Sequence, residues 1–135
     1  MRAFLCASAL SVVTAVAADP PVAVHNITAL PGWTDVGHEL PSNMYTGFID
    51  AGVPPSGVGK MYFHYWLMES EGDPATDPVV IWYNGGPGAS SLFGLLQELG
   101  PLLLNENSYD EHYNKTGIPT LQRNEYGWTK AATVV

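Results

Sequence analysis

The chain has 135 residues, of which 46% are hydrophobic, and it carries 13 acidic against 5 basic side chains, a formal net charge of −8 at pH 7. A chain of this length can form one domain with a modest hydrophobic core. So few cations argue against nucleic acid, or any other polyanion, as a partner.

Residues 1–18 have the three-part form of a secretory signal peptide. An uncharged run from Ala3 to Ala18 follows Arg2, and small residues suited to cleavage end the run. A membrane anchor is the alternative, but a span needs roughly 20 apolar residues. We therefore expect no stable membrane insertion after cleavage. The only cysteine, Cys6, lies inside this signal, so the mature chain has no disulfide and no thiol nucleophile.

Two triplets of the form Asn-x-Thr begin at Asn26 and Asn114. Both become acceptors for N-glycosylation if the chain enters the secretory pathway. Such triplets are common by chance, and the signal peptide gives them weight.

The mature chain is predicted to begin with an extended arm, because residues 19–43 are rich in Pro and Gly and show no sustained period. A short aromatic strand is expected at Met44–Asp50 and a stronger one at Lys60–Ser70. The segment Ala51–Gly59 between them has the composition of a turn. These elements predict a hairpin at the edge of a sheet.

The next predicted strand, Val79–Tyr83, is a continuous apolar run of the kind that is buried on both faces of a sheet. A helix is predicted after it, capped by Ser90 or Ser91 and ended by Gly100 and a proline. Its apolar side carries Leu92, Leu95, Leu96 and Leu99.

Beyond that helix the composition becomes polar, and Asn105–Gly117 is predicted to be a long exposed loop. Ala131–Val135 has the β-branched residues of a strand that has just begun. The order is therefore a hairpin, a buried strand, a helix and the opening of another strand. This order is the beginning of an α/β sheet.

The stretch Asn84-Gly85-Gly86-Pro87-Gly88 occupies the corner where the strand becomes the helix. One interpretation is a tight turn, since glycine tolerates positive φ. The other is an anion site, because N–H groups at a strand end and at a helix start can point together at a negative oxygen. The spacing alone leaves both interpretations open.

The sequence has no complete phosphate-binding loop, nucleophile elbow or metal-binding motif. Gly52–Lys60 lacks the earlier glycine and the final Ser or Thr of a phosphate-binding loop. Gly88–Leu92 lacks the second glycine of a nucleophile elbow. No metal and no cofactor is expected, because no metal-binding spacing links the four histidines, which are His25, His38, His64 and His112.

The run from Asp77 to Pro101, DPVVIWYNGGPGASSLFGLLQELGP, closely resembles the characteristic block of the serine carboxypeptidases, which are secreted or vacuolar α/β-hydrolases. The likeness continues in YTGFID, YFHYWLMES and NEYGWTKAATVV, and so covers Tyr45 to Val135. It implies that residues 44–135 are the N-terminal part of an α/β-hydrolase domain whose sheet is incomplete here.

The resemblance implies roles for individual residues. The Gly86 backbone N–H would belong to the oxyanion hole, and Asn84 with Glu98 would bind the free α-carboxylate of a peptide. A glutamate in that role must hold a proton, so its pKa should be raised and activity should peak in acid. A solvated helix face is the other explanation of Glu98. The residues expected to bind substrate are Asn84, Gly85, Phe93, Gln97 and Glu98.

The sequence also departs from the family's pattern. Ala89 stands where many members have a disulfide-forming cysteine. The nucleophilic serine of the family lies in a Gly-Glu-Ser-Tyr-Ala-Gly elbow, with its aspartate and histidine later, and none of these occurs here. We therefore expect an N-terminal fragment without the Ser/Asp/His triad, so that purified residues 19–135 hydrolyse no blocked dipeptide.

The function implied by the resemblance is a serine-type carboxypeptidase. It would be secreted or vacuolar-lysosomal, and it would release C-terminal residues from peptides with a free carboxylate through an acyl-enzyme. Two alternatives remain. The same fold and block serve acyltransferases, which an acyl-ester donor would reveal. The second alternative is a secreted, non-catalytic binding protein, which a stable and cooperatively unfolding species would favour.

Overall fold

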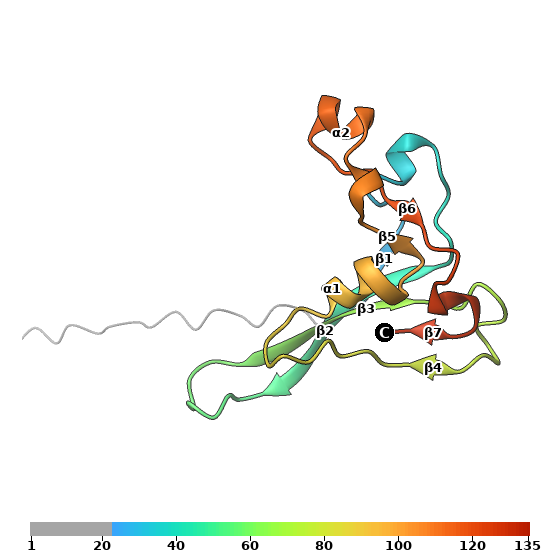
Figure 1. The fold of residues 1–135 in the computed structure, drawn as a ribbon. Helices are drawn as coiled ribbons and strands as arrows, with labels where there is room; N and C mark the ends of the chain where they lie inside the picture. The colour runs from blue at the N-terminus through green and yellow to red at the C-terminus, as the bar shows by residue number, and fades with distance from the viewer. Residues whose placement is uncertain (1–22) are drawn as a thin grey trace, which may run out of the picture.

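The computed structural model describes residues 23–135, so the predicted signal peptide lies outside the described residues. The described chain forms a five-stranded sheet and a separate two-stranded sheet (Figure 1). The strands of the larger sheet lie in the order β1 (His25–Ile27), β2 (Met44–Gly52), β3 (Met61–Met68), β7 (Thr133–Val134) and β4 (Val79–Val80).

Strands β2 and β3 form the predicted hairpin. They pair antiparallel from Met44 opposite Met68 to the turn, with a register shift between Asp50 and Gly52. Their aromatic and β-branched residues suit a pleated strand, which is why the pattern was informative. The hairpin does not lie at the sheet edge, because β1 pairs antiparallel on the outer side of β2.

The arm predicted over residues 19–43 is more structured than expected in its described part. Besides β1, it forms a 3-10 turn, η1 (Thr34–Val36). Trp33 is buried, and its indole N–H donates to the Glu39 carbonyl at 2.7 Å. The Pro- and Gly-rich composition concealed these elements because each is only three residues long.

Strand β7 confirms the strand predicted at the end of the sequence, and it makes the sheet mixed. It lies between β3 and β4, pairing antiparallel with the first and parallel with the second. A mixed sheet packed against a few helical segments is compatible with an α/β fragment.

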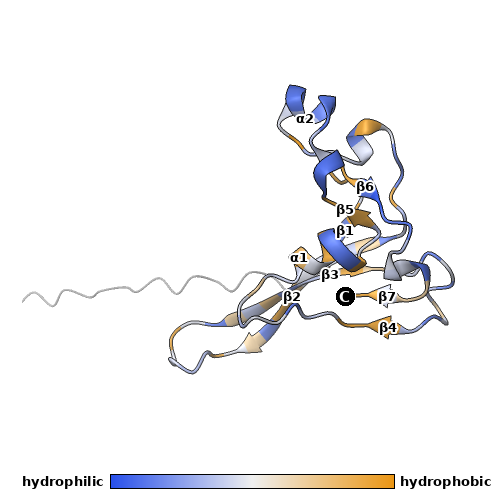
Figure 2. Ribbon diagram, viewed as in Figure 1, coloured by the Kyte–Doolittle hydropathy of each residue, from blue (hydrophilic) through white to orange (hydrophobic). Residues whose placement is uncertain are grey.

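The expectation that Val79–Tyr83 is buried on both faces is wrong. Val79, Ile81 and Tyr83 are 64%, 60% and 76% exposed, whereas Val80 and Trp82 between them are half-buried. The predicted strand is also shorter than expected, since only Val79–Val80 pairs in the sheet as β4. The alternation of exposure continues to Tyr83, because successive side chains of an extended chain face opposite sides. The side that carries Val80 is therefore covered and the other side is open, although β4 itself is hydrophobic (Figure 2).

The predicted helix is present and lies over the larger sheet, as α1 (Leu92–Gly94) and the π-type turn η2 (Leu95–Leu99) (Figure 1). It ends, as expected, before Gly100. Two of its four predicted apolar residues, Leu95 and Leu99, are buried in a core with Met44, Met68 and Val134. No helix in residues 23–135 is long and apolar enough to span a bilayer.

The long loop predicted over Asn105–Gly117 is wrong, because this segment contains η3 (Glu106–Ser108) and the helix α2 (Glu111–Thr116). The Asp110 carboxylate caps α2 by accepting from the Tyr113 N–H at 3.1 Å. Helix α2 could not be predicted from the sequence, because the helix is short and has no buried residues that would give an apolar period.

The smaller sheet lies beside this region and joins β5 (Leu102–Leu103) to β6 (Gln122–Arg123). Leu102 and Leu121 pack against the Trp33 indole in a second core. One further 3-10 turn, η4 (Trp128–Lys130), leads into β7.

Candidate functional site

The glycine-rich corner after β4 is a tight and exposed turn. Gly85 and Gly86 have φ angles of 79° and 122°, in the left-handed region that favours glycine. The Ala89 N–H closes the turn by donating to the Gly85 carbonyl at 3.2 Å. Within residues 23–135 the Gly86 N–H has no hydrogen-bond acceptor, so this donor is available to an incoming oxygen.

Asn84 begins the corner and turns its carbonyl oxygen into the protein. This oxygen, Oδ1, lies 3.3 Å from the Trp82 indole nitrogen and 3.1 Å from the Gly94 backbone nitrogen. Both neighbours can only donate, so the oxygen rather than the amide nitrogen must face them. The Nδ2 group has no acceptor among the described residues, and it is the part of the side chain left for a ligand.

The helix approaches Asn84 closely at Gly94. A Cβ atom at Gly94 would lie 2.5 Å from the Trp82 indole nitrogen and 2.7 Å from Asn84 Oδ1, so any side chain would displace them. Sequence reasoning missed this role, although a glycine inside a helical pattern is a recognised signal of close packing.

The two serines before the helix differ in function, although both were predicted to be caps. The Ser90 hydroxyl accepts from the Leu92 N–H at 3.3 Å, which is a local contact at the helix start. Ser91 occupies the cap position but makes no capping hydrogen bond with its side chain. Its hydroxyl instead accepts from the Asn84 N–H at 3.2 Å.

The contact between Asn84 and Gly94 also places Glu98. Gly94 is the third residue of the helical segment, and Glu98 follows it by four positions, so the two are neighbours one turn apart. The glycine corner therefore docks within one turn of Glu98. No hydrogen bond joins the side chains of Asn84 and Glu98 among residues 23–135. Glu98, Phe93 and Gln97 are exposed on the same segment.

The far end of the helix is fixed by Asn124. The Asn124 amide donates to the carbonyl oxygens of Glu98 and Gly100 at 3.0 and 2.8 Å, and its Oδ1 accepts from the Tyr126 N–H at 3.0 Å. Asn124 is 4% exposed. Its amide nitrogen therefore holds the end of the helix that carries Glu98, and its oxygen holds the turn at Tyr126.

The loop before β4 is held by a carboxylate. Asp77 accepts from the Ser70 hydroxyl at 2.6 Å and from the Asp73 N–H at 2.9 Å. These bonds, the one from Ser70 above all, lower the pKa of the Asp77 carboxyl from its usual 3.8. Beside this loop, Glu71 pairs with Arg123, whose guanidinium also donates to the Pro101 carbonyl at 3.0 Å.

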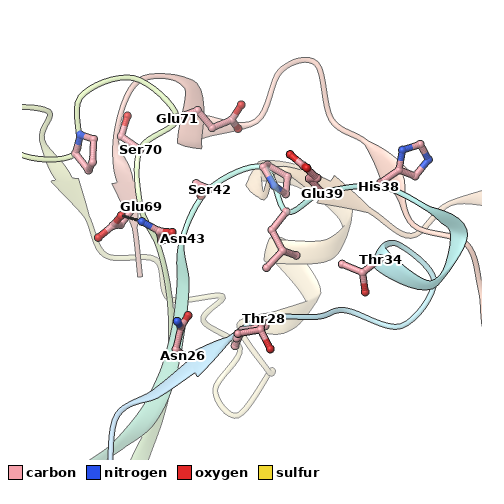
Figure 3. Close-up of a pocket in the computed structure, with 14 residues that line it drawn as sticks. Asn26, Thr28, Thr34, His38, Glu39, Ser42, Asn43, Glu69, Ser70 and Glu71 are labelled. Atoms are coloured by element: carbon pink, nitrogen blue, oxygen red, sulfur yellow. Dashed lines mark hydrogen bonds between the residues drawn. The ribbon is translucent and has the colours of Figure 1, made fainter.

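A hollow of about 650 Å³ lies elsewhere, between the N-terminal arm and the segment after β3 (Figure 3). Asn43 donates to Glu69 on one side of it, at 2.8 Å, and Thr34 and His38 line the other. None of the residues expected to bind substrate lines this hollow. No group of three or more His, Cys, Asp or Glu in residues 23–135 could hold a metal ion.

Comparison with known proteins shows the family to which the chain belongs. A family model described as serine carboxypeptidase matches residues 31–135, a stretch that contains the whole glycine corner and the helix. The chain belongs to the serine carboxypeptidase family. This membership was the resemblance stated from the sequence, and it is confirmed.

Relatives come from several kingdoms. The chain is 38% identical over 109 residues to serine carboxypeptidase 1 of Hordeum vulgare, covering 81% of this chain and 19% of the relative. The figures are the same for the lysosomal protective protein of Mus musculus. Carboxypeptidase Y homolog A of Aspergillus oryzae is 42% identical over 91 residues, which are 67% of this chain and 14% of the relative. The chain thus spans at most about a fifth of these relatives.

Proposed function

We propose that this chain is the N-terminal part of a serine-type carboxypeptidase with an α/β-hydrolase fold. In this proposal Asn84 and Glu98, with Gly85, bind the free α-carboxylate of a peptide, and the Gly86 N–H is one donor of the oxyanion hole. Phe93 and Gln97 line the pocket for the last side chain. The triad serine, aspartate and histidine come from outside these 135 residues.

One observation carries the proposal. The Asn84 Oδ1 atom faces two donors, so its Nδ2 group is left without a protein acceptor among the described residues, two positions before the unpaired N–H of Gly86. Two kinds of N–H donor at an exposed corner suit two oxygens of a substrate, one at the terminal carboxylate and one at the scissile carbonyl. An oxyanion-hole donor contributes about 3 kcal/mol to stabilising the transition state.

The test is an Asn84→Asp substitution in the complete enzyme. A carboxylate has nearly the shape of the amide but offers an oxygen where Nδ2 stood, so it repels a substrate carboxylate. We expect kcat/KM for an N-blocked dipeptide with a free carboxylate to fall by about 100-fold or more, equivalent to about 3 kcal/mol. The same dipeptide as its C-terminal amide should lose far less.

Asn107→Asp is the matched control, because Asn107 is exposed and its side chain has no hydrogen-bond partner among residues 23–135. It adds the same charge away from the corner and should leave both substrates within about twofold. Equal losses on the acid and the amide in Asn84→Asp would contradict carboxylate recognition by Asn84.

We also propose a secretory route, with removal of residues 1–18 and glycans on Asn26 and Asn114. Both asparagines are exposed, the first on the edge strand β1 and the second on α2. Mass spectrometry of the secreted protein, before and after enzymatic release of N-glycans, tests this. An unmodified Asn26 or Asn114 would remove that site from the proposal.

A further inference from the structure

Asn84 is fixed by three hydrogen bonds to other residues. Its side-chain oxygen accepts from Trp82 and from Gly94, and its backbone N–H donates to the Ser91 hydroxyl. Two of these three partners, Ser91 and Gly94, belong to the start of the helix and lie seven and ten positions further along the chain.

Gly94 offers Asn84 a donor that the helix itself leaves unused. The N–H groups of the first helical turn have no acceptor within the helix. The Gly94 N–H is one of them, and Asn84 Oδ1 accepts from it at 3.1 Å. Because a Cβ atom there would lie 2.7 Å from the same oxygen, the contact requires glycine.

Ser91 fixes the backbone of Asn84 in the same way. Its hydroxyl accepts from the Asn84 N–H at 3.2 Å, whereas the hydroxyl of its neighbour Ser90 accepts from Leu92. Ser91 is half-buried and Ser90 is exposed. The chain therefore contains two adjacent serines of which only one contacts the recognition residue.

We propose that Ser91 and Gly94 are positioning residues that orient the Asn84 amide, so that its Nδ2 group faces the substrate carboxylate. This inference rests on the proposed function. Ser91 fixes the backbone of Asn84 at the start of the glycine corner, and Gly94 holds the amide oxygen against the helix. Neither residue touches substrate, and both act through Asn84.

The first experiment compares Ser91→Ala with Ser90→Ala in the complete enzyme. The readout is the ratio of kcat/KM for an N-blocked Phe-Leu dipeptide to that for its C-terminal amide. Losing one orienting hydrogen bond should lower this ratio about tenfold in Ser91→Ala, through a higher KM for the acid. Ser90→Ala should keep the wild-type ratio, and Ser91→Thr, which retains the hydroxyl, should restore most of it.

The second variant, Gly94→Ala, displaces the amide oxygen directly and should lower the ratio by about 100-fold, the effect of misplacing a binding group by about 1 Å. Circular dichroism confirms that each variant is folded. A wild-type enzyme that prefers the acid while Ser91→Ala and Gly94→Ala both retain that preference would overturn the positioning role alone. A wild-type enzyme that accepts the acid and the amide equally would overturn the proposed function itself.

Discussion

Two asparagines hold the two ends of the same helix, and they use their amides differently. Asn124, at the C-terminal end, is 4% exposed, and both its amide oxygen and its amide nitrogen form hydrogen bonds within the protein. Asn84, at the N-terminal end, is half-buried, and only its amide oxygen does so. The N–H donors of the Asn84 amide therefore stay unused among the described residues.

Two residues of the same type can therefore be distinguished by how many of their polar atoms are hydrogen-bonded within the protein. A buried polar group is expected to be fully hydrogen-bonded, because an unpaired one is costly. Asn84 is only half-buried, so water can accept from its Nδ2 group until a ligand oxygen takes that place. Substitutions at the two asparagines should therefore have different effects on stability.

The largest effect is expected from Asn124→Ala. This change removes the donor to the carbonyl oxygens of Glu98 and Gly100 in a buried corner. We expect the free energy of unfolding to fall by about 3 kcal/mol, because buried carbonyls then lack partners. Urea denaturation measures it, with Asn107→Ala on the exposed surface as the control. A loss no larger than in the control would show that Asn124 is no clamp.

Asn84→Ala should affect stability less than the same change at Asn124. Water can reach the half-buried corner and replace the acceptor for Trp82 and Gly94. We expect a loss of about 1 kcal/mol in the free energy of unfolding, together with a large loss of activity on free-carboxylate peptides. If Asn84→Ala destabilises as much as Asn124→Ala, the two residues are both structural and the distinction fails.

The smallest effect on stability is expected from lowering the pH. It should arise at the Asp77 carboxylate rather than at either asparagine. The folded-state pKa of Asp77 lies below its ordinary value of 3.8, chiefly because the Ser70 hydroxyl donates to it. The stability it contributes is therefore fully present above the unfolded pKa and is lost as the pH falls through the folded pKa.

Denaturation midpoints of the wild type and Asp77→Asn at about pH 6 and about pH 3 measure this contribution. The difference between the two proteins should shrink at the lower pH, because below the unfolded pKa the unfolded wild-type chain takes up a proton that the folded carboxylate resists. A difference that stays constant would mean that Asp77 does not contribute through its charge.

Elements with a strong local signal could be predicted from the sequence. The hairpin β2–β3, the helix with its end before Gly100 and the strand β7 follow from aromatic, leucine and β-branched patterns. Strand β1 and helix α2 could not, because each is short and α2 carries no apolar period. The exposure of Val79 was also out of reach, since burial depends on what packs over a strand.

Some features of the candidate site could likewise be predicted from the sequence, and others could not. The glycine corner is visible as a motif, and the resemblance to a family supplied roles for Asn84 and Glu98. The contributions of Ser91 and Gly94 are long-range contacts made by residues that read locally as a cap and as a helix interior. Glu98 follows Gly94 by four positions on the same helical segment, and spacing could not show that this segment packs against Asn84 at Gly94.

The position of β7 between β3 and β4 has a consequence during synthesis. In the described sheet β4 pairs only with β7, which leaves the ribosome about 50 residues later. At about 5–20 residues per second, β4 and the glycine corner behind it wait for several seconds before they can join the sheet. The glycine corner is therefore among the last parts of this region to take shape on a nascent chain.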